Sequence, residues 1–316
     1  MFDIVKNDLE KLEEILLEVV SSPVPLITEI GTHLVKAGGK RLRPALYFLA
    51  NCKVARTKNI MDLAVALELI HMATLVHDDV VDKAATRRGI ITANAKWGNQ
   101  ISVLTGDYLF SKAFSLVAQN PNSRIMSVLT DLICAMSEGE IIQNQEIFVP
   151  EMEESVYFTK IAKKTADFIA ASCELGAIMA ELSTDEVEAL RQYGYCIGMA
   201  FQITDDILDI TATTEKMGKP VGNDLLQGIV TLQTIYAMNN SVDKDELKQI
   251  VATQNMTKEQ LARGLSIINE TAAIKYSYQV VDDYLTKARN VLPSCLDTEV
   301  KEAFNSVADF VQMRDF

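Results

Sequence analysis

The sequence contains few of the residues that interrupt helices. Glycine and proline contribute 14 and 7 of its 316 residues, together about half of what average protein composition would give. Alanine, leucine, glutamate, lysine and methionine are plentiful, and these residues favour helices. No segment alternates convincingly between apolar and polar residues, as a half-buried strand does. The composition therefore predicts an all-α fold.

The chain also lacks the features of secreted, membrane-spanning and nucleic-acid-binding proteins. Its five cysteines form no CxxC pair, and their odd number does not suit a disulfide framework. No apolar run reaches the roughly 18 uncharged residues of a bilayer span, because Glu68 interrupts the richest one, 63–76. The acidic N-terminal segment does not resemble a signal peptide. A net charge of −13 argues against nucleic-acid binding. We therefore expect a cytoplasmic protein without stable membrane insertion.

Apolar residues recur at helical spacing along nearly the whole chain. The predicted helices cover 3–20, 26–37, 43–52, 61–82, 101–118, 123–147, 153–181, 186–212, 225–239, 244–253, 257–288 and 297–312. Helices 61–82 and 186–212 are apolar on nearly all sides except near their C-terminal ends, which is typical of helices buried inside a bundle. No low-complexity linker or solenoid repeat divides the chain. We therefore predict one helical domain spanning residues 1–316.

Two of these buried helices end in the same acidic pattern. Helix 61–82 ends with Asp78, Asp79 and Asp82, and helix 186–212 carries Asp205, Asp206 and Asp209. In each pattern the first and last aspartates are four residues apart and face the same side. Carboxylates at the C-terminal end of an apolar helix are unfavourable unless cations compensate for their burial and for the helix dipole. We therefore predict that all six aspartates bind Mg²⁺, with Mn²⁺ as a substitute, rather than form solvated helix ends.

Positively charged residues cluster beside these acidic motifs. The clusters are Gly38-Gly39-Lys40-Arg41-Leu42-Arg43-Pro44, Arg87-Arg88-Gly89, Lys163-Lys164-Thr165 and Gly218-Lys219-Pro220. The first is not a P-loop, because the GxxxxGK[ST] spacing and the preceding strand are missing. Arginine and lysine bind phosphate oxygens well. A single cluster would fit a solvated surface patch, but their positions beside the aspartates favour phosphate binding.

Two further polar residues share a helix face with the aspartates. His71 lies seven residues before Asp78, and Gln202 lies three residues before Asp205. His71 could contact a diphosphate, or it could be a buried histidine bonded to the backbone. The dipeptide His77-Asp78 also fits an HD-type metallohydrolase. That site needs more ligands than the remaining histidines, His33 and His71, supply.

In this order and spacing, these motifs resemble those of the trans-isoprenyl diphosphate synthase family. The resemblance covers nearly the whole chain and rests on DDVVD, DDILD, GGKRLRP, RRG, KKTA and FQITDD. The stretches AKWGNQ, TGDYLF and GKPVGNDLLQG look most like the catalytic large subunit of bacterial hexaprenyl or heptaprenyl diphosphate synthases. The family often has Thr-Leu-Pro where this chain has Thr231-Leu232-Gln233, a change that affects a helix start and no catalytic role.

The resemblance implies a bundle around a central cavity, in which isopentenyl diphosphate is joined to an allylic diphosphate to give a long all-trans polyprenyl diphosphate. It implies that catalysis depends on Asp78, Asp82, Asp205, Arg87, Lys164 and Lys219. The implied allylic site is Arg87, Lys164, Thr165, Gln202 and Lys219. The implied isopentenyl site is Lys40, Arg43, His71 and Arg88. The family is dimeric, so we expect a homodimer or a heterodimer with a small regulatory subunit.

Product length is predicted from two small residues. Thr74 and Ala73 lie four and five residues before Asp78, where short-chain family members have a bulky aromatic residue. Their size predicts a deep tunnel and a long product. Close packing between helices would also account for small residues there.

Two other functions remain open from the sequence. A non-catalytic partner subunit of such an enzyme would lack one or both acidic motifs, and this chain contains both. A terpene cyclase shares the fold and the metal chemistry of the family. A cyclase binds one diphosphate, however, and does not need the GGKRLRP cluster.

Overall fold

The structure, a computed structural model, describes residues 1–87, 89–118, 120–211 and 221–313. Helices make up nearly all of its regular structure, which confirms the predicted all-α fold. The chain divides into two compact units, residues 1–129 with 172–187 and residues 130–171 with 188–316. Three helices contribute residues to both units: α7 (Ser123–Gln145), α9 (Asp167–Met179) and α10 (Thr184–Thr211). A single domain over the whole chain stays a prediction.

The first unit is built around the apolar helix α4 (Lys58–Val81). It is preceded by η1 (Asp3–Val5), α1 (Lys6–Val19), α2 (Pro25–Lys36) and α3 (Leu42–Ala50). It is followed by β1 (Thr86–Arg87), β2 (Ile90–Ile91), α5 (Ala93–Trp97) and α6 (Asn99–Val117). By length and composition α4 could cross a membrane, but most of its apolar stretch is buried within the structure. Such burial is typical of a core helix in a soluble protein.

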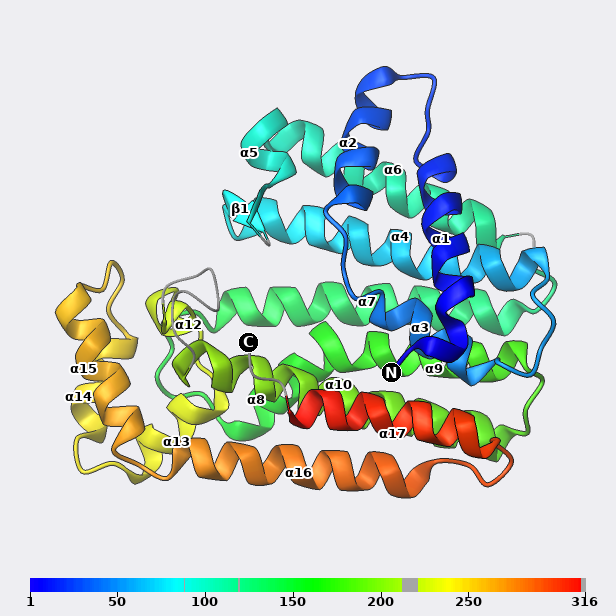
Figure 1. Cartoon of the computed structure of the whole chain (residues 1–316). Helices are drawn as coiled ribbons and strands as arrows, with labels where there is room; N and C mark the ends of the chain where they lie inside the picture. Colours follow the sequence, from blue (N-terminus) through cyan, green and yellow to red (C-terminus); the bar gives the residue numbers. More distant parts are fainter. Residues whose placement is uncertain (88, 119, 212–220, 314–316) are drawn as a thin grey trace. The chain divides into compact units, whose positions relative to one another are not determined.

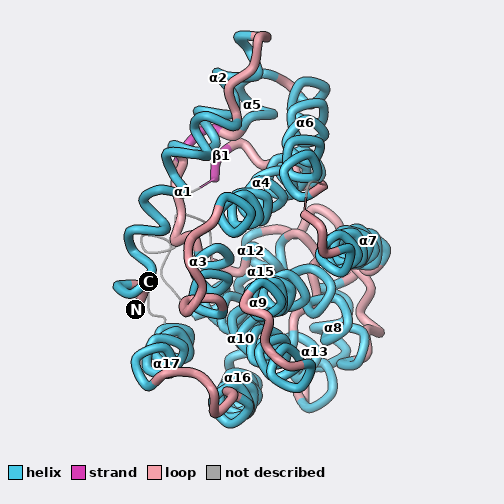
Figure 2. Tube along the Cα trace, turned by 90° about the vertical axis from the view of Figure 1, so that its right-hand side faces the viewer, coloured by secondary structure: helices cyan, strands magenta, loops and turns pink. Residues whose placement is uncertain are grey.

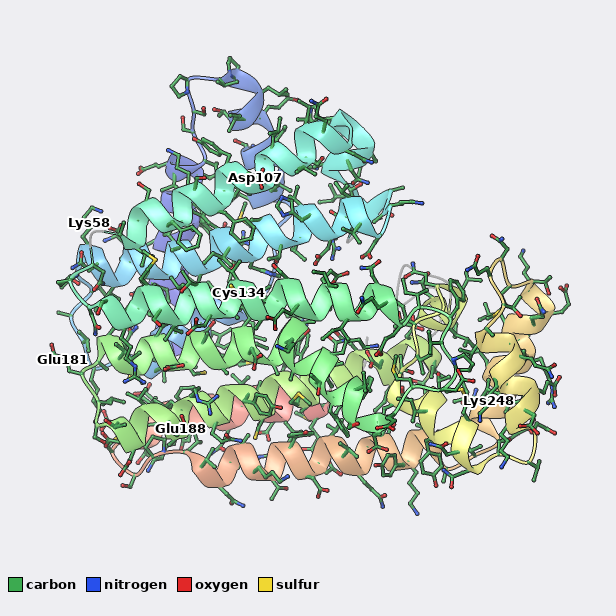
Figure 3. The ribbon with its side chains drawn as sticks, turned by 180° about the vertical axis from the view of Figure 1, so that it is seen from behind. Lys58, Asp107, Cys134, Glu181, Glu188 and Lys248 are labelled. Carbon is green, nitrogen blue, oxygen red and sulfur yellow. The ribbon has the colours of Figure 1, made fainter. Side chains whose placement is uncertain are left out.

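Helices α4 and α6 pack side by side, as Figures 1 and 2 show. Gly106 of α6 permits a close approach, because a Cβ atom there would lie 2.1 Å from His77 Nε2. The His77 ring hydrogen-bonds to the carbonyl of Val103 at 3.1 Å. It also lies 3.6 Å from the carboxylate of Asp107, which is labelled in Figure 3. The last turns of α4 are therefore held firmly against α6.

A small apolar cluster supports the acidic end of α4. Its members are Ile30, Val76 and Ala93, with Leu34, Trp97 and Ile101 packed against them. These residues come from α2, α4, α5 and α6. Since Val76 lies two residues before Asp78, the cluster fixes the turn that presents the first acidic motif.

A hairpin whose strands are each two residues long, and a short helix that follows it, were not predicted. In the hairpin, Thr86 pairs with Ile91 and Arg87 pairs with Ile90 in antiparallel register. Strands of two residues are too short to show alternating polarity, so no sequence pattern predicts them. The short helix α5 is separated from α6 by Gly98, whose positive φ of 87° breaks the helical path.

The second unit continues the helical chain. Besides parts of α7, α9 and α10, it contains α8 (Glu154–Ile161), the π-helical turn η2 (Ala162–Ala166), α12 (Asn223–Leu226), α13 (Leu232–Asn240), α14 (Lys244–Val251), α15 (Lys258–Asn269), α16 (Ala273–Val291) and α17 (Thr298–Gln312). Helices α16 and α17 contact each other, and Arg289 bonds to Asp309 between them at 2.8 Å. All five cysteines are free; Figure 3 labels Cys134 on α7.

Three predicted helices of this unit are interrupted. The predicted helix 153–181 is α8, η2 and α9. The predicted helix 225–239 breaks at Gly228, whose φ is 74°. The predicted helix 257–288 breaks after α15, because the Thr271 hydroxyl donates to the carbonyl of Ile268 and accepts from the backbone N–H of Ala273. The threonine side chain therefore replaces helical hydrogen bonds at this corner.

Glycines on α10 allow η2 and α9 to approach closely. A Cβ atom on Gly198 would lie 2.4 Å from the Cα of Ala166 in η2. A Cβ atom on Gly194 would lie 2.6 Å from the carbonyl oxygen of Ile169 in α9. Because backbone atoms cannot rotate away, both positions require glycine.

We predict that Gly198→Ala lowers the free energy of unfolding by about 1–3 kcal/mol, as overpacking typically does. Gly264→Ala on α15 is the matched control, because its nearest neighbour is the mobile end of the Leu225 side chain. Urea unfolding of both variants measures the difference. Equal stabilities would show that η2 can move away from α10 without cost.

Candidate active site

The first acidic motif lies at the C-terminal end of α4. Asp79 is 3% exposed, while Asp78 is half-buried and Asp82 is exposed. The backbone N–H of Asp82 donates to the carbonyl of Asp78 at 2.8 Å, so the helical path continues to the last aspartate. The two outer aspartates therefore share a side of the helix end, and the middle one points inward.

Asp79 is held by residues from the hairpin and α5. Arg87 Nε donates to Asp79 Oδ1 at 2.8 Å. Asn94 donates its side-chain amide to the backbone carbonyls of Asp79 and Ala84, both at 3.0 Å. Burial raises the pKa of Asp79, and the Arg87 charge opposes this rise. Arg87 thus lies at the first motif, as predicted, whereas Arg88 lies outside the described residues.

Two of the residues predicted to bind isopentenyl diphosphate meet in the first unit. Arg43 Nη1 lies 3.2 Å from His71 Nε2, so α3 and α4 bring the pair together. Lys40 lies exposed three residues before Arg43, in the turn that leads into α3. Ala73 is buried, and Thr74 is half-buried with its hydroxyl bonded to the carbonyl of His71 at 2.8 Å.

The second acidic motif lies near the C-terminal end of α10. Asp206 is 5% exposed and accepts hydrogen bonds from Tyr157 Oη at 2.6 Å and from Gln202 Nε2 at 2.9 Å. Asp209 is buried and accepts from the backbone N–H of Asp224 at 3.0 Å. Asp205 is half-buried. As in the first motif, the middle aspartate is committed to protein partners.

The buried Lys160 provides a positive charge near this motif. Its ammonium group donates to the carbonyl of Val230 at 3.2 Å and interacts electrostatically with Asp206, Glu146 and Asp224. Burial lowers its pKa, and these carboxylates oppose the change. Burial, with a contribution from Asp224, raises the pKa of Asp206 to about 7. Acidic groups therefore outnumber this ammonium around the second motif.

The Lys163-Lys164-Thr165 cluster lies in the π-helical turn η2. The backbone N–H of Asp167 donates to the carbonyl of Ala162, five residues back, which defines the π-helical geometry. Lys164 Nζ lies 2.8 Å from a carboxylate oxygen of Glu140 on α7. The Thr165 hydroxyl donates to Gln202 Oε1 at 2.8 Å. Turns of this kind occur frequently at functional sites.

Hydrogen bonds join two of the predicted allylic-site residues to the second acidic motif in the second unit. Thr165 donates to Gln202, and Gln202 donates to Asp206. The predicted Lys219 lies outside the described residues. The two acidic motifs belong to different units, so the structure describes the contacts of each motif only within its own unit. The six-aspartate metal set stays a prediction.

The aspartates fit a divalent metal through their donor chemistry. Among the residues that the structure describes, no three histidine, cysteine, aspartate or glutamate side chains form a complete metal site. Mg²⁺ does not require one, because it keeps several waters and takes oxygens from substrate phosphates. Asp78 and Asp82 supply carboxylate oxygens from one helix end, which suits such a partial protein shell.

The histidines do not support the HD-type metal site. His33 bonds to the carbonyl of Ile91 and contacts the edge of Trp97. His71 contacts Arg43, and His77 packs against α6. Each histidine thus has a different set of neighbours within the first unit.

Arg41, which the sequence grouped with a phosphate-binding cluster, is instead bonded to Glu13 and Glu68. Further charged and polar residues of the site region had no role predicted from the sequence: Glu68, Asn94, Glu140, Tyr157 and Lys160. The sequence feature that could have identified two of them is a charged residue within an apolar segment. Glu68 interrupts the apolar run of α4, and Lys160 is buried on α8. A buried charge requires a partner nearby, but the sequence alone does not identify that partner.

Comparisons with known proteins agree with these features. The polyprenyl synthetase family profile matches residues 24–268. The chain is 40% identical to heptaprenyl diphosphate synthase component 2 of Geobacillus stearothermophilus, over 100% of this chain and 98% of that protein. The heptaprenyl diphosphate synthase structure from Staphylococcus aureus has a TM-score of 0.93 and 33% identity, covering 99% of both chains. A polyprenyl synthase structure from Caulobacter crescentus CB15, complexed with calcium and isoprenyl diphosphate, has a TM-score of 0.91 and 33% identity, covering 98% of this chain and 96% of that one.

The raised pKa of Asp206 predicts a pH-dependent stability in the metal-free protein. Between about pH 4, the ordinary aspartate value, and its folded-state value of about 7, the folded protein keeps a proton that the unfolded chain has released. The free energy of unfolding should therefore fall as the pH rises through this window. One proton gives a slope of at most about 1.4 kcal/mol per pH unit.

Asp206→Asn should reduce this slope, whereas Asp131→Asn, at an exposed position on α7, should preserve it. Urea unfolding in EDTA at pH 5, 6, 7 and 8 measures the effect. An unchanged slope in the Asp206 variant would mean that this carboxyl releases its proton at an ordinary pH.

Proposed function

The chain belongs to the polyprenyl synthetase family, and from that premise we propose which of its residues bind each substrate. It is a trans-prenyltransferase that acts on prenyl diphosphates. One observation carries the assignment of residues. The middle aspartate of each acidic motif is fixed by residues of a predicted diphosphate site, Arg87 at Asp79 and Gln202 at Asp206.

The allylic diphosphate is bound by five polar residues in this proposal. Its ligands are Arg87, Lys164, Thr165, Gln202 and Lys219. The hydrogen bonds of Thr165 and Gln202 support this grouping, because they align both side chains with the second motif. Isopentenyl diphosphate is bound by Lys40, Arg43, His71 and Arg88. The contact between Arg43 and His71 supports this second grouping.

Divalent metal ions are typical of the family, and we propose that Mg²⁺ serves here, with Mn²⁺ as a substitute. Asp78, Asp82 and Asp205 would hold the ions, because their side chains are more exposed than those of Asp79 and Asp206. Asp79, Asp206 and Asp209 complete the predicted set. When bound, the metal supplies positive charge to the diphosphate oxygens.

The reaction breaks the bond between the allylic carbon and its diphosphate oxygen. The double bond of isopentenyl diphosphate then attacks the allylic cation, and a proton is lost. Arg87, Lys164 and Lys219 stabilise the negative charge that gathers on the departing diphosphate. Apolar surroundings protect the cation from water. The released diphosphate can accept the proton, so no protein side chain is assigned as the base.

Product length and partners belong to this proposal as well. A relative is named heptaprenyl diphosphate synthase component 2, which implies a first component in that enzyme. We propose a long-chain product here and a dimer, formed with a second copy or with a smaller subunit, in the cytoplasm. A non-catalytic role is disfavoured because both acidic motifs are present. A terpene cyclase would show no dependence on isopentenyl diphosphate.

We predict that purified protein with farnesyl diphosphate, isopentenyl diphosphate and Mg²⁺ forms longer polyprenyl diphosphates, detected by mass spectrometry. If activity requires a partner subunit, the small subunit of a related synthase must be added. Asp78→Ala and Asp205→Ala should each lower turnover by orders of magnitude without unfolding the protein, because both remove a metal ligand. Undiminished activity in excess EDTA would contradict the metal-dependent mechanism.

We also predict that Ala73→Tyr shortens the product by whole five-carbon units. The ring would block the tunnel one turn or more from the diphosphates, so condensation itself should continue. Product mass is measured beside thermal unfolding, because overpacking of a buried alanine typically costs about 1–3 kcal/mol. A well-folded variant with the parental product length would remove this face of α4 from the tunnel wall.

A further inference from the structure

Three cations lie within four residues at the start of α3, but they have different environments. Lys40 is exposed, and Arg43 contacts His71. Arg41 is 8% exposed and points into the first unit. It is therefore turned away from solvent, although its two neighbours belong to the proposed isopentenyl diphosphate site.

All three guanidinium nitrogens of Arg41 are hydrogen-bonded. Nε lies 2.5 Å from Glu13 Oε1, and Nη2 lies 3.1 Å from Glu13 Oε2. Nη1 lies 2.5 Å from Glu68 Oε1, and Nη2 also donates to the carbonyl of Val35 at 3.1 Å. These contacts connect the turn to α1, α2 and α4. A single side chain thus fixes the turn in three directions.

The backbone of Arg41 adopts a conformation that this side chain must support. Its φ of 47° and ψ of 39° are left-handed, which is unfavourable for a residue with a Cβ atom. Arg41 is also the N-terminal cap of α3, and its carbonyl accepts the backbone N–H of Ala45 at 2.9 Å. The direction in which α3 starts, and with it the position of Arg43, depends on this residue.

Glu68 supplies the charge that requires Arg41. It is 2% exposed, in the most apolar part of α4. A buried carboxylate needs a cation with good geometry, and arginine provides it through several donors. Glu68 lies three residues before His71, on the same face of the helix. Arg41 and Glu68 therefore connect the two segments that carry Arg43 and His71.

We propose that Arg41 is a positioning residue for isopentenyl diphosphate. Held by Glu13 and Glu68, it keeps the turn in the left-handed conformation that directs Lys40 and Arg43 toward the same diphosphate. It does not touch the substrate itself. The inference rests on the proposed function, because it assigns a role to a neighbour of that site.

The test uses Arg41→Met/Glu68→Met, which removes both buried charges together. Replacing a buried ion pair with apolar residues of similar size often preserves stability, whereas removing one partner leaves an uncompensated charge. The Glu13 side chain is 41% exposed and can be solvated by water once Arg41 is removed. The double variant should remain folded, yet its KM for isopentenyl diphosphate should rise tenfold or more. The KM for the allylic diphosphate should change by less than threefold.

The matched control is Asp8→Asn/Arg56→Met. Arg56 Nε bonds to Asp8 of α1 at 2.9 Å, and its other nitrogens bond to carbonyls around the end of α3, so this pair also anchors α1. These contacts lie at the C-terminal end of α3, whereas Lys40 precedes its N-terminal end. The control should leave both KM values within threefold of the parent. A purely structural role of α1 would instead raise the isopentenyl KM equally in both double variants.

A second variant, Arg41→Lys, covers the case in which the double variant does not fold. It keeps a positive charge beside Glu68 but cannot make all the arginine contacts. It should raise the isopentenyl KM in the same selective way, by a smaller factor. Folded variants with an unchanged isopentenyl KM, or with equal rises for both substrates, would overturn the proposal. Parental protein with no isopentenyl-dependent activity would overturn the proposed function first, so the two failures are distinguishable.

Discussion

Helices α4 and α10 bury some of the carboxylates that they carry in apolar surroundings, and much of the site region follows from this constraint. Helix α4 buries Glu68 and Asp79, and α10 buries Asp206. Each of these carboxylates needs donors from neighbouring segments. Arg41 and Arg87 meet this need on α4, and Tyr157 of α8 meets it on α10, together with Gln202 of α10 itself. The segments that supply the donors are thereby fixed beside the acidic motifs.

The groups around each buried carboxylate also influence its pKa. Burial raises the pKa of both Asp79 and Asp206. At Asp79 the charged Arg87 opposes that rise directly. At Asp206 the nearby Asp224 adds to it, and the uncharged donors Tyr157 and Gln202, together with the more distant charge of Lys160, oppose it. The two motifs have the same sequence pattern, yet they differ in electrostatic character before any ligand binds.

The sequence was sufficient for features that depend on periodicity and on adjacent residues. It predicted the helical class and the two acidic helix ends, whereas the grouping of Thr165 with Gln202 and of Arg43 with His71 came from the resemblance to the family. It could not predict the partner of Glu68, because Arg41 lies 27 residues away and reaches it through a left-handed turn. It also missed the corner at Thr271, where a side chain replaces backbone hydrogen bonds. Such features depend on three-dimensional proximity, which periodicity does not reveal.

The π-helical turn η2 has a consequence for how this chain tolerates insertions and deletions. An α-helix rotates by about 100° per residue, so one extra residue within a turn shifts the register of everything after it by that angle. Continuous α-helical periodicity across 153–181 therefore assigns α8 and α9 to mismatched faces. Deleting one residue between Ala162 and Ala166 would leave a regular helix but separate the face that carries Tyr157 from the face that packs against Gly194. Loss of a residue here would thus disturb the chain more than loss of a residue in a surface loop.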